Sequence, residues 1–298
     1  MFGVLSVLHT SIYLRRKGGL MADLTVIILT KNEELNIAQC IESVKSIAKR
    51  IVVVDSFSTD NTVDIARRMG ADVYQHEFIN HSKQFKWALE NTNIRTKWVL
   101  RIDADERLAP ETAIEIEEKT KAHENDNVNG FLIKRRNYFL GRFIRHGGMY
   151  PLKFLRLFKH GKADVEDRNM DEHIILLEGS YLELENDLLH FDFKDLHSWI
   201  AKHNEYARKE VQDYFEKREE SIGYLDTKTR MKRILKYKLY YKMPLFVRPF
   251  LYFCYRYFIR LGFLDGKEGL IFHFLQAFWY RFLVDAMIYE RRKNEGKI

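Results

Sequence analysis

The sequence is poor in the residues that define several classes of protein. Among its 298 residues there are two cysteines, Cys40 and Cys254, four prolines and 15 glycines. Two cysteines exclude a disulfide-rich scaffold and a cysteine-rich zinc site. The low proline and glycine content excludes collagen-like and low-complexity chains.

Long uncharged apolar runs are also missing. The two most apolar stretches, residues 244–264 and 269–289, are interrupted by charged or polar side chains, so neither predicts a transmembrane helix. The short apolar run at residues 2–14 precedes a basic cluster, the reverse of the order in a secretory signal. We therefore interpret residues 1–22 as an N-terminal extension and expect a cytoplasmic protein.

Several common catalytic and binding motifs are absent as well. There is no glycine-rich phosphate-binding loop, no nucleophile elbow and no H-E-x-x-H zinc motif. Phosphate binding would therefore depend on a metal and on basic side chains. The formal net charge is +7, but no nucleic-acid-binding motif accompanies it, so we expect no nucleic-acid partner.

Apolar residues make up 46% of the chain, enough for a sizeable core, and residues 24–105 alternate strand and helix signals. Strands are predicted at residues 24–30, 50–56, 71–75 and 97–106, and helices at 32–47, 58–70 and 81–92. This alternation predicts an α/β fold with a mostly parallel sheet flanked by helices. Such sheets bind ligands beyond the carboxyl ends of their strands.

Acidic residues lie at those predicted strand ends. Asp103 and Asp105 lie in the acidic turn at the end of the segment predicted at residues 97–106, and Asp55 lies at the end of the strand at 50–56. Mg²⁺ and Mn²⁺ prefer oxygen ligands and take one or two carboxylates plus substrate phosphates. One acid of the D-x-D pair would hold a metal and the other a ribose or a metal-bound water. Asp55 could accept the imide N–H of uracil; the alternative is a helix-capping role, for which Asp60 is the better candidate.

Other residues near the same edge are candidates for nucleotide binding. Thr30, Asn32 and Glu33 end or follow the first strand, while Lys83 and Lys86 lie on the helix before the D-x-D strand. The alternative for Asn32 and Glu33 is an ordinary first helical turn. For the two lysines, a solvated helix face explains the pattern almost as well.

The second half of the chain offers fewer candidates. Asp171 and Glu172 precede an apolar run, and either could act as a general base towards an acceptor hydroxyl. An acidic surface turn explains them equally simply. His190 follows a strand-like stretch, and a lone histidine in such a place is more often part of the core than a ligand.

The C-terminal part predicts an amphipathic helical extension. Residues 227–264 contain ten basic residues and no acid, interleaved with aromatic side chains. This composition is typical of segments at an anionic membrane surface, where rings lie at headgroup depth and cations reach lipid phosphates. A helical subdomain with a solvated basic face is the alternative. We divide the chain into residues 1–22, a catalytic domain at 23–195 and a membrane-associating region at 196–298.

The ordered series LTVIILTKNEE, IVVVDSFSTDNT, KQFKWAL and WVLRIDADE resembles the family-two glycosyltransferases of the GT-A fold. It is most similar to the bacterial enzymes that add a glucose-type sugar to lipopolysaccharide core or related glycolipids. The resemblance covers roughly residues 23–195, and the tail is similar to the membrane-proximal helices of that group.

The resemblance implies a UDP-sugar donor, a divalent metal (Mg²⁺ or Mn²⁺) and inversion at the anomeric carbon. It implies that Asp55 contacts the base, Asp103 the ribose and Asp105 the metal, with His190 as a metal or diphosphate contact. Glu172 would be the preferred base over Asp171. Gly147 and Gly148 would border the donor sugar or the acceptor. The family's usual Arg-Asn before the D-x-D strand is Phe85-Lys86 here.

The predicted function is metal-dependent hexose transfer to a hydroxyl of a lipid-linked or lipopolysaccharide-type acceptor. The enzyme would be held peripherally at the inner face of the cell membrane. One alternative is a polyprenyl-phosphate sugar transferase, which needs no general base because its acceptor is already an anion. Another is a non-catalytic membrane protein that binds sugar nucleotides.

Overall fold

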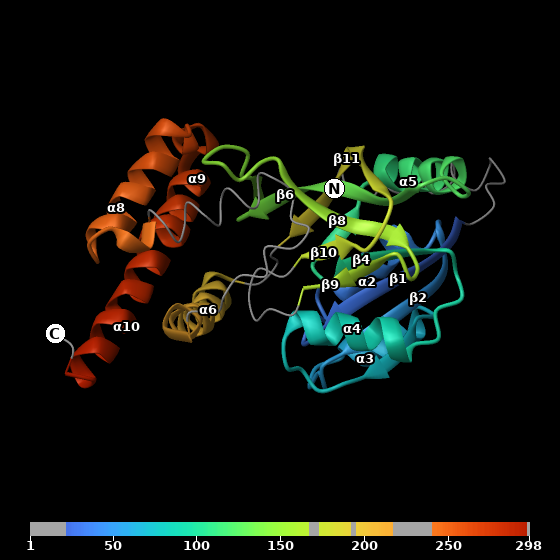
Figure 1. Ribbon diagram of the computed structural model, residues 1–298, viewed down its shortest axis with the longest axis horizontal. Helices are drawn as coiled ribbons and strands as arrows, with labels where there is room; N and C mark the ends of the chain where they lie inside the picture. The colour runs from blue at the N-terminus through green and yellow to red at the C-terminus, as the bar shows by residue number, and fades with distance from the viewer. Residues whose placement is uncertain (1–21, 167–172, 192–194, 217–239, 297–298) are drawn as a thin grey trace. The chain divides into compact units, whose positions relative to one another are not determined.

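The computed structural model describes residues 22–166, 173–191, 195–216 and 240–296. These form two compact units, drawn in Figure 1. The N-terminal unit comprises the described residues up to 135 and from 153 to 190, and the C-terminal unit comprises residues 136–152 and the described residues from 191 onward. Residues 136–152 are thus grouped with the C-terminal helices, while the division proposed from the sequence stays a prediction.

Four parallel strands form the first half of the sheet in the N-terminal unit. They are β1 (Ala22–Thr30), β2 (Ala48–Asp55), β3 (Asp72–Gln75) and β4 (Trp98–Asp103), in the spatial order β3-β2-β1-β4. The register pairs Thr30 with Asp55 and Leu29 with Asp103. Three strands therefore end at one edge of the sheet, with Thr30, Asp55 and Asp103 close to one another, as the sequence predicted.

Helices cover both faces of these strands, which explains their continuous apolar sequences. The helices are α2 (Ile37–Val44), α3 (Thr62–Arg68), α4 (His81–Asn91) and α5 (Pro110–Ala122). Val26 and Ile28 of β1 belong to the core cluster that includes α2, α3 and α5, whereas Ile27 and Leu29 pack in the cluster of Phe85 on α4. Because side chains alternate along a strand, the even-numbered residues of β1 face one layer of helices and the odd-numbered residues face the other.

The remaining strands extend the sheet in the order β4-β8-β6-β11-β5. They are β5 (Glu106–Leu108), β6 (Val128–Phe139), β8 (Leu152–Lys159) and β11 (Ser180–Phe191), and a separate hairpin is formed by β9 (Ala163–Val165) and β10 (Ile174–Leu176). β8 is antiparallel to β4, and β5 is antiparallel to β11. The predicted parallel arrangement therefore holds for the first half of the sheet, and antiparallel pairs occur in the second half. The α/β fold class is confirmed.

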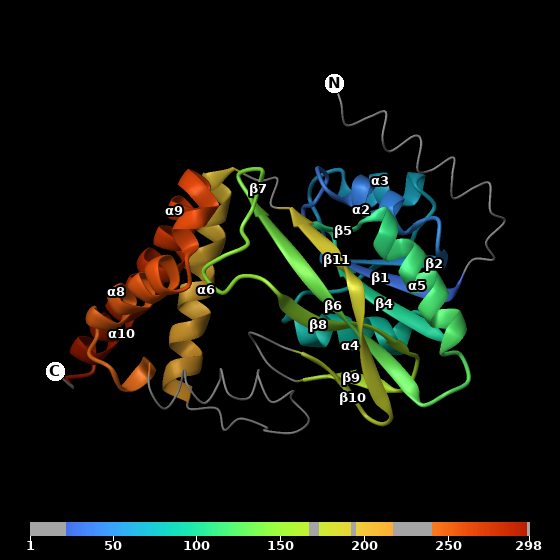
Figure 2. The same cartoon turned by 90° about the horizontal axis from the view of Figure 1, so that it is seen from above.

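The C-terminal unit is mainly helical, as expected (Figure 2). Its elements are β7 (Arg142–Phe143), α6 (Leu196–Glu216), η1 (Tyr240–Lys242), α8 (Val247–Cys254), η2 (Tyr255–Ile259), η3 (Gly262–Asp265), α9 (Gly266–His273), η4 (Phe274–Trp279) and α10 (Tyr280–Asn294). Ala207 and Val211 of α6 pack against Val284 and Ile288 of α10. Among the described residues, no helix has both the length and the apolar character needed to cross a membrane.

Buried ion pairs hold these helices together. Arg248 donates from Nε and Nη2 to the Asp285 carboxylate at 2.8 and 2.5 Å, and both side chains are 1% exposed. Arg256 is also buried and donates to the carbonyl of Gly147 at 2.9 Å and to Gln276. The expectation that basic residues of this segment reach lipid phosphates is therefore wrong for Arg248 and Arg256.

The Arg248–Asp285 pair gives a test of how this unit is stabilised. Asp285→Ala should lower the free energy of unfolding by about 3–5 kcal/mol, because it leaves a buried guanidinium without its counter-charge. Glu290→Ala, at an exposed position of the same helix, should change the free energy by less than about 0.5 kcal/mol. Urea unfolding measures both, and equal small effects would contradict the stabilising role of the pair.

Candidate functional site

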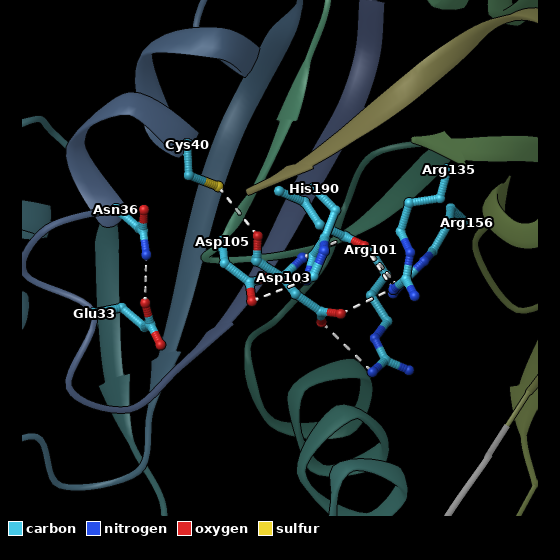
Figure 3. A network of polar contacts seen from close by, with 10 residues as sticks. Glu33, Asn36, Cys40, Arg101, Asp103, Asp105, Arg135, Arg156 and His190 are labelled. Carbon is cyan, nitrogen blue, oxygen red and sulfur yellow. Dashed lines mark hydrogen bonds and ion pairs between the residues drawn. The ribbon is translucent and has the colours of Figure 1, made fainter. Parts of the chain in front are cut away.

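The D-x-D segment turns tightly at the carboxyl end of β4. Asp103 is the last residue of β4, and Glu106 begins β5 after the two residues Ala104 and Asp105. β5 pairs with β11 so that Glu106 lies opposite His190. As a result, His190 Nε2 lies 3.1 Å from Asp105 Oδ2 (Figure 3). The structure thus joins the two residues that the sequence proposed as metal ligands.

An arginine–carboxylate network surrounds Asp103. We use this name for Arg101, Arg135 and Arg156 with Asp103 and Glu106. Arg156 Nη2 lies 3.1 Å from both Asp103 Oδ2 and Glu106 Oε1. Arg101 Nη2 lies 3.6 Å from Asp103 Oδ1, and Arg135 Nη1 lies 3.4 Å from Glu106 Oε1. Three guanidinium groups face these two carboxylates, and Asp105 adds a third carboxylate to the same turn, so the arginines balance the charge of the acids.

The network also fixes the backbone of the turn. Glu106 is fully buried, and its Oε2 accepts the backbone N–H of Asp103 at 3.0 Å. A buried carboxylate is stable only when it is paired and hydrogen-bonded, and here Arg135 and Arg156 supply the counter-charges. Glu106 therefore holds the turn that presents Asp105.

Asp103 is kept ionised by its neighbours. Burial opposes ionisation, but the guanidinium groups of Arg156 and Arg101 hold the pKa of this carboxyl well below its ordinary value. The side chain remains 28% exposed. Asp103 is therefore a permanently charged hydrogen-bond acceptor that a ligand can reach.

Cys40 lies beneath the same turn without a catalytic environment. Its Sγ donates to the backbone oxygen of Asp103 over 3.6 Å. Burial first, and then the nearby carboxylate of Glu106, raises the pKa of the thiol well above its usual range. A thiol that stays protonated is a poor nucleophile, so Cys40 acts as a small packing residue.

The loops after β1 and β2 are joined by hydrogen bonds. The backbone N–H of Asn32 donates to Ser58 Oγ at 2.8 Å, and Asn32 Oδ1 accepts from the N–H of Thr59 at 2.8 Å. The N–H of Glu33 donates to Thr62 Oγ1 at 2.8 Å. These contacts bring the predicted residues Asn32 and Glu33 into one structure with the loop that follows Asp55.

Asp55 is completely buried and heavily hydrogen-bonded. Its Oδ2 accepts from the N–H of Ser58 at 2.9 Å and from Gln75 Nε2 at 3.1 Å, and its Oδ1 accepts from the Ser58 hydroxyl. The helix-capping contact belongs instead to Asp60, whose Oδ1 accepts from the N–H of Thr62 at 3.0 Å. Since a carboxylate can accept about four hydrogen bonds, Asp55 retains capacity for a further donor.

The other predicted residues have varied surroundings. Thr30 is buried at the end of β1. Lys83 and Lys86 are exposed on α4, and Lys86 lies 3.8 Å from Asp164. Gly147 and Gly148 belong to the C-terminal unit. Asp171 and Glu172 lie outside the described residues, so their proposed roles stay predictions.

The sequence interpretation missed the three arginines and Glu106. Arg101 could have been noticed, because it interrupts the apolar strand two residues before Asp103 and therefore shares its face. Arg135 and Arg156 come from β6 and β8, whose pairing brings together residues far apart in the chain. Only the sheet order reveals that they reach Asp103 and Glu106.

The pKa of Asp103 makes a prediction about acid stability. In the folded state, the pKa of the Asp103 carboxyl lies below its ordinary value of 3.8. The ionised carboxylate therefore stabilises the fold above pH 3.8, and this contribution is lost as the pH falls towards the lower pKa of the folded state. Below about pH 5, the free energy of unfolding should fall more steeply for the wild type than for Asp103→Asn. Urea unfolding across this range, with the exposed-site variant Asp64→Asn as control, measures the slopes. Identical slopes for wild type and Asp103→Asn would contradict the charge pairing.

Comparison with known proteins identifies the class of protein to which this chain is similar. Residues 25–170 match the family model described as glycosyl transferase family 2. The lipopolysaccharide core biosynthesis glycosyltransferase LpsC of Rhizobium meliloti is 29% identical over 285 residues, which cover 92% of this chain and 94% of LpsC. An uncharacterized glycosyltransferase of Rickettsia felis is 29% identical over 201 residues, covering 65% of this chain and 70% of the relative.

A solved structure of glucosyl-3-phosphoglycerate synthase from Mycobacterium tuberculosis, in complex with Mn²⁺, uridine diphosphate and glucosyl-3-phosphoglycerate, is a more distant match. It is 16% identical, with a TM-score of 0.40, and the match covers 64% of this chain and 78% of that chain. The family match and the sheet topology define the protein as a glycosyltransferase with a GT-A fold. Its residues 25–170 match glycosyl transferase family 2.

Proposed function

We propose that the enzyme transfers a hexose-type sugar from a UDP-sugar to a hydroxyl of a lipid-linked or lipopolysaccharide-type acceptor, with inversion and with a divalent metal. The observation that carries the proposal is the contact between Asp105 and His190 beside the ionised Asp103. This arrangement lies at the carboxyl edge of the parallel strands, where open α/β sheets bind their ligands.

The donor nucleotide would occupy the edge between β1, β2 and β4. Asp103 is ionised and partly exposed, which makes it suitable for accepting hydrogen bonds from ribose hydroxyls. Asp55 has acceptor capacity left for the imide N–H of uracil, but its carboxylate is fully buried, so this contact would require the loop at Ser58 to move. The guanidinium groups of Arg101, Arg135 and Arg156 offset the acids of the turn, which would lower the repulsion that a diphosphate meets there.

The residues present fit a divalent metal. Asp105 would supply a carboxylate oxygen and His190 an imidazole nitrogen, and the described part of the chain contains no cluster of three candidate ligands. Mg²⁺ characteristically uses one or two protein ligands and completes its shell with water and substrate phosphates. When bound, the metal would neutralise the charge that develops on the departing diphosphate.

The acceptor proton requires a general base, and we propose Glu172, with Asp171 as the alternative. The residues on either side of this segment are anchored in the N-terminal unit. The N–H of Glu166 donates to the carbonyl of His173 at 3.0 Å, and the Ser82 hydroxyl donates to the carbonyl of Glu166 at 2.5 Å. A base at this position would take the hydroxyl proton as the oxygen attacks the anomeric carbon from the face opposite the diphosphate, which gives inversion.

The acceptor class is supported by the relative LpsC, whose name places it in lipopolysaccharide core biosynthesis, and by the C-terminal unit. Around η2 and η3, large apolar side chains are 44–72% exposed: Phe258, Ile259, Leu261, Phe263 and Leu264. We call these residues the apolar tip. Such a concentration of exposed apolar surface marks a site of interaction, and we propose that it enters the surface of an anionic membrane.

The metal role of Asp105 is tested by Asp105→Ala. Turnover, measured as release of uridine diphosphate in the presence of Mn²⁺ and an acceptor glycolipid, should fall by at least about a hundredfold, because the carboxylate ligand is lost. Asp64→Ala, which removes an exposed carboxylate from α3, should leave turnover unchanged. Undiminished turnover of Asp105→Ala at any Mn²⁺ concentration would remove this residue from the metal site.

The membrane role of the apolar tip is tested by Ile259→Asp. Ile259 is 72% exposed, so the substitution should preserve folding while weakening binding to anionic vesicles roughly tenfold, the cost of withholding one large apolar side chain. Leu177→Asp, at a position 59% exposed in the N-terminal unit, serves as the matched control. Equal vesicle binding by the wild type and both variants would count against the tip as the membrane contact.

A further inference from the structure

A basic turn lies next to the apolar tip in the C-terminal unit. We use this name for His146, Gly147 and Gly148 together with Arg256, Arg260 and His273. The backbone N–H of Gly147 donates to the carbonyl of Arg260 at 2.9 Å, and the Arg256 guanidinium donates to the carbonyl of Gly147 at 2.9 Å. These bonds tie the glycine turn to η2, and Arg260 is flanked in the chain by Ile259 and Leu261 of the tip.

His146 is held in a fixed orientation by a buried carboxylate. Its backbone N–H and its ring Nδ1 lie 2.8 and 2.6 Å from the two oxygens of Asp265, whose side chain is 4% exposed. A carboxylate only accepts hydrogen bonds, so Nδ1 carries the hydrogen. Nε2 has no partner among the described residues, and the imidazole is about one third exposed. Nε2 is therefore the ring nitrogen that a ligand can approach.

The two glycines allow basic groups to approach the backbone closely. Gly147 and Gly148 have φ angles of +66° and +76°, which favour glycine. A Cβ on Gly147 would lie 2.0 Å from the His273 ring, and the Arg260 guanidinium lies 3.9 Å from the Cβ position of Gly148. The turn is thus shaped to sit between a buried imidazole and an exposed guanidinium.

Buried polar groups beneath the turn lack partners. Arg256 and His273 are 3% and 0% exposed, yet Nη2 of Arg256 and both ring nitrogens of His273 have no hydrogen-bond partner among the described residues. The pKa of His273 is lowered to about 4, first by burial and then by the charge of Arg256. Asp265 is the one carboxylate bonded to this group of residues in the described structure. Unsatisfied buried polar atoms of this kind are unusual in native proteins, and here they lie beneath a turn whose more exposed side chains are Arg260 and His146.

We propose that the basic turn binds a phosphate group, with Arg260 and His146 as its exposed donors. The position of Arg260 within the apolar tip points to a phosphate at the surface of a lipid layer. That phosphate would belong either to a lipid headgroup or to a phosphorylated, lipid-linked acceptor. Both sources rest on the membrane contact of the apolar tip proposed above, and the second also rests on the proposed transferase function.

The test is binding of the full-length protein to two kinds of phosphatidylcholine vesicle with matched surface charge. One contains phosphatidic acid, which carries a phosphate monoester, and the other contains phosphatidylserine. The wild type should bind the phosphatidic acid vesicles roughly tenfold more tightly, because charge-assisted hydrogen bonds to the monoester are lost with the other lipid. Arg260→Gln and His146→Asn should remove this preference without lowering the midpoint of thermal unfolding.

Lys267→Gln is the matched control, because it removes the same charge from another exposed position of this unit and should keep the preference. The proposal would be overturned if Arg260→Gln and Lys267→Gln lost the preference for phosphatidic acid vesicles equally. It would also be overturned if the wild type bound both kinds of vesicle equally well. Vesicles in which a polyprenyl phosphate replaces phosphatidic acid, at matched surface charge, separate the two sources. Tighter binding to the polyprenyl phosphate would identify a phosphorylated, lipid-linked acceptor, and equal or weaker binding would identify the phosphate of a lipid headgroup. The assay contains no sugar nucleotide, so its failure leaves the transferase function untouched.

Discussion

The ion pairing of Arg101, Arg135 and Arg156 with Asp103 and Glu106 is the constraint on which the site depends. A turn that carries Asp103, Asp105 and Glu106 within four residues concentrates negative charge at the end of a buried strand. Without counter-charges, these acids would take up protons or distort the turn. The three guanidinium groups keep Asp103 ionised and Glu106 in place, so the turn can present Asp105 beside His190.

Local sequence patterns predicted the framework of this site well. β1, β2 and β4 are continuous apolar runs ending in polar residues, and their carboxyl ends meet because the strands are parallel. The strand pattern of the sequence is therefore sufficient to assign Asp55, Asp103 and Asp105 to one edge of the sheet. The contact of His190 with Asp105 agrees with the role that the family resemblance implied for both residues, although metal binding stays a proposal.

Features that depend on distant parts of the chain could not be predicted in this way. Lys83 and Lys86, on the helix before the D-x-D strand, were the cations proposed from the sequence, but the cations that contact Asp103 and Glu106 are arginines from β4, β6 and β8. The same limit applies to the tail. Its composition indicated arginines facing lipid, whereas Arg248 is neutralised by Asp285, 37 residues away in the chain. Helical periodicity alone does not show which basic residue has a buried acid opposite it.

The C-terminal unit combines two surface chemistries. Its buried ion pairs leave Phe258, Ile259 and Leu261 exposed, with Arg260 among them. Under the proposed function, an acceptor embedded in a lipid layer would require both apolar contact with the layer and recognition of the charged groups at its surface. The exposed apolar side chains and Arg260 would supply these two contacts.

The central claim is that Asp105 and His190 hold a divalent metal against the diphosphate of the donor. The most direct measurement is the anomalous difference density of a crystal of the enzyme grown with uridine diphosphate and Mn²⁺. The account predicts a manganese peak that bridges the Asp105 carboxylate and the diphosphate, with His190 next to it. Uridine diphosphate bound at the edge of the sheet with no manganese peak at Asp105 would contradict it.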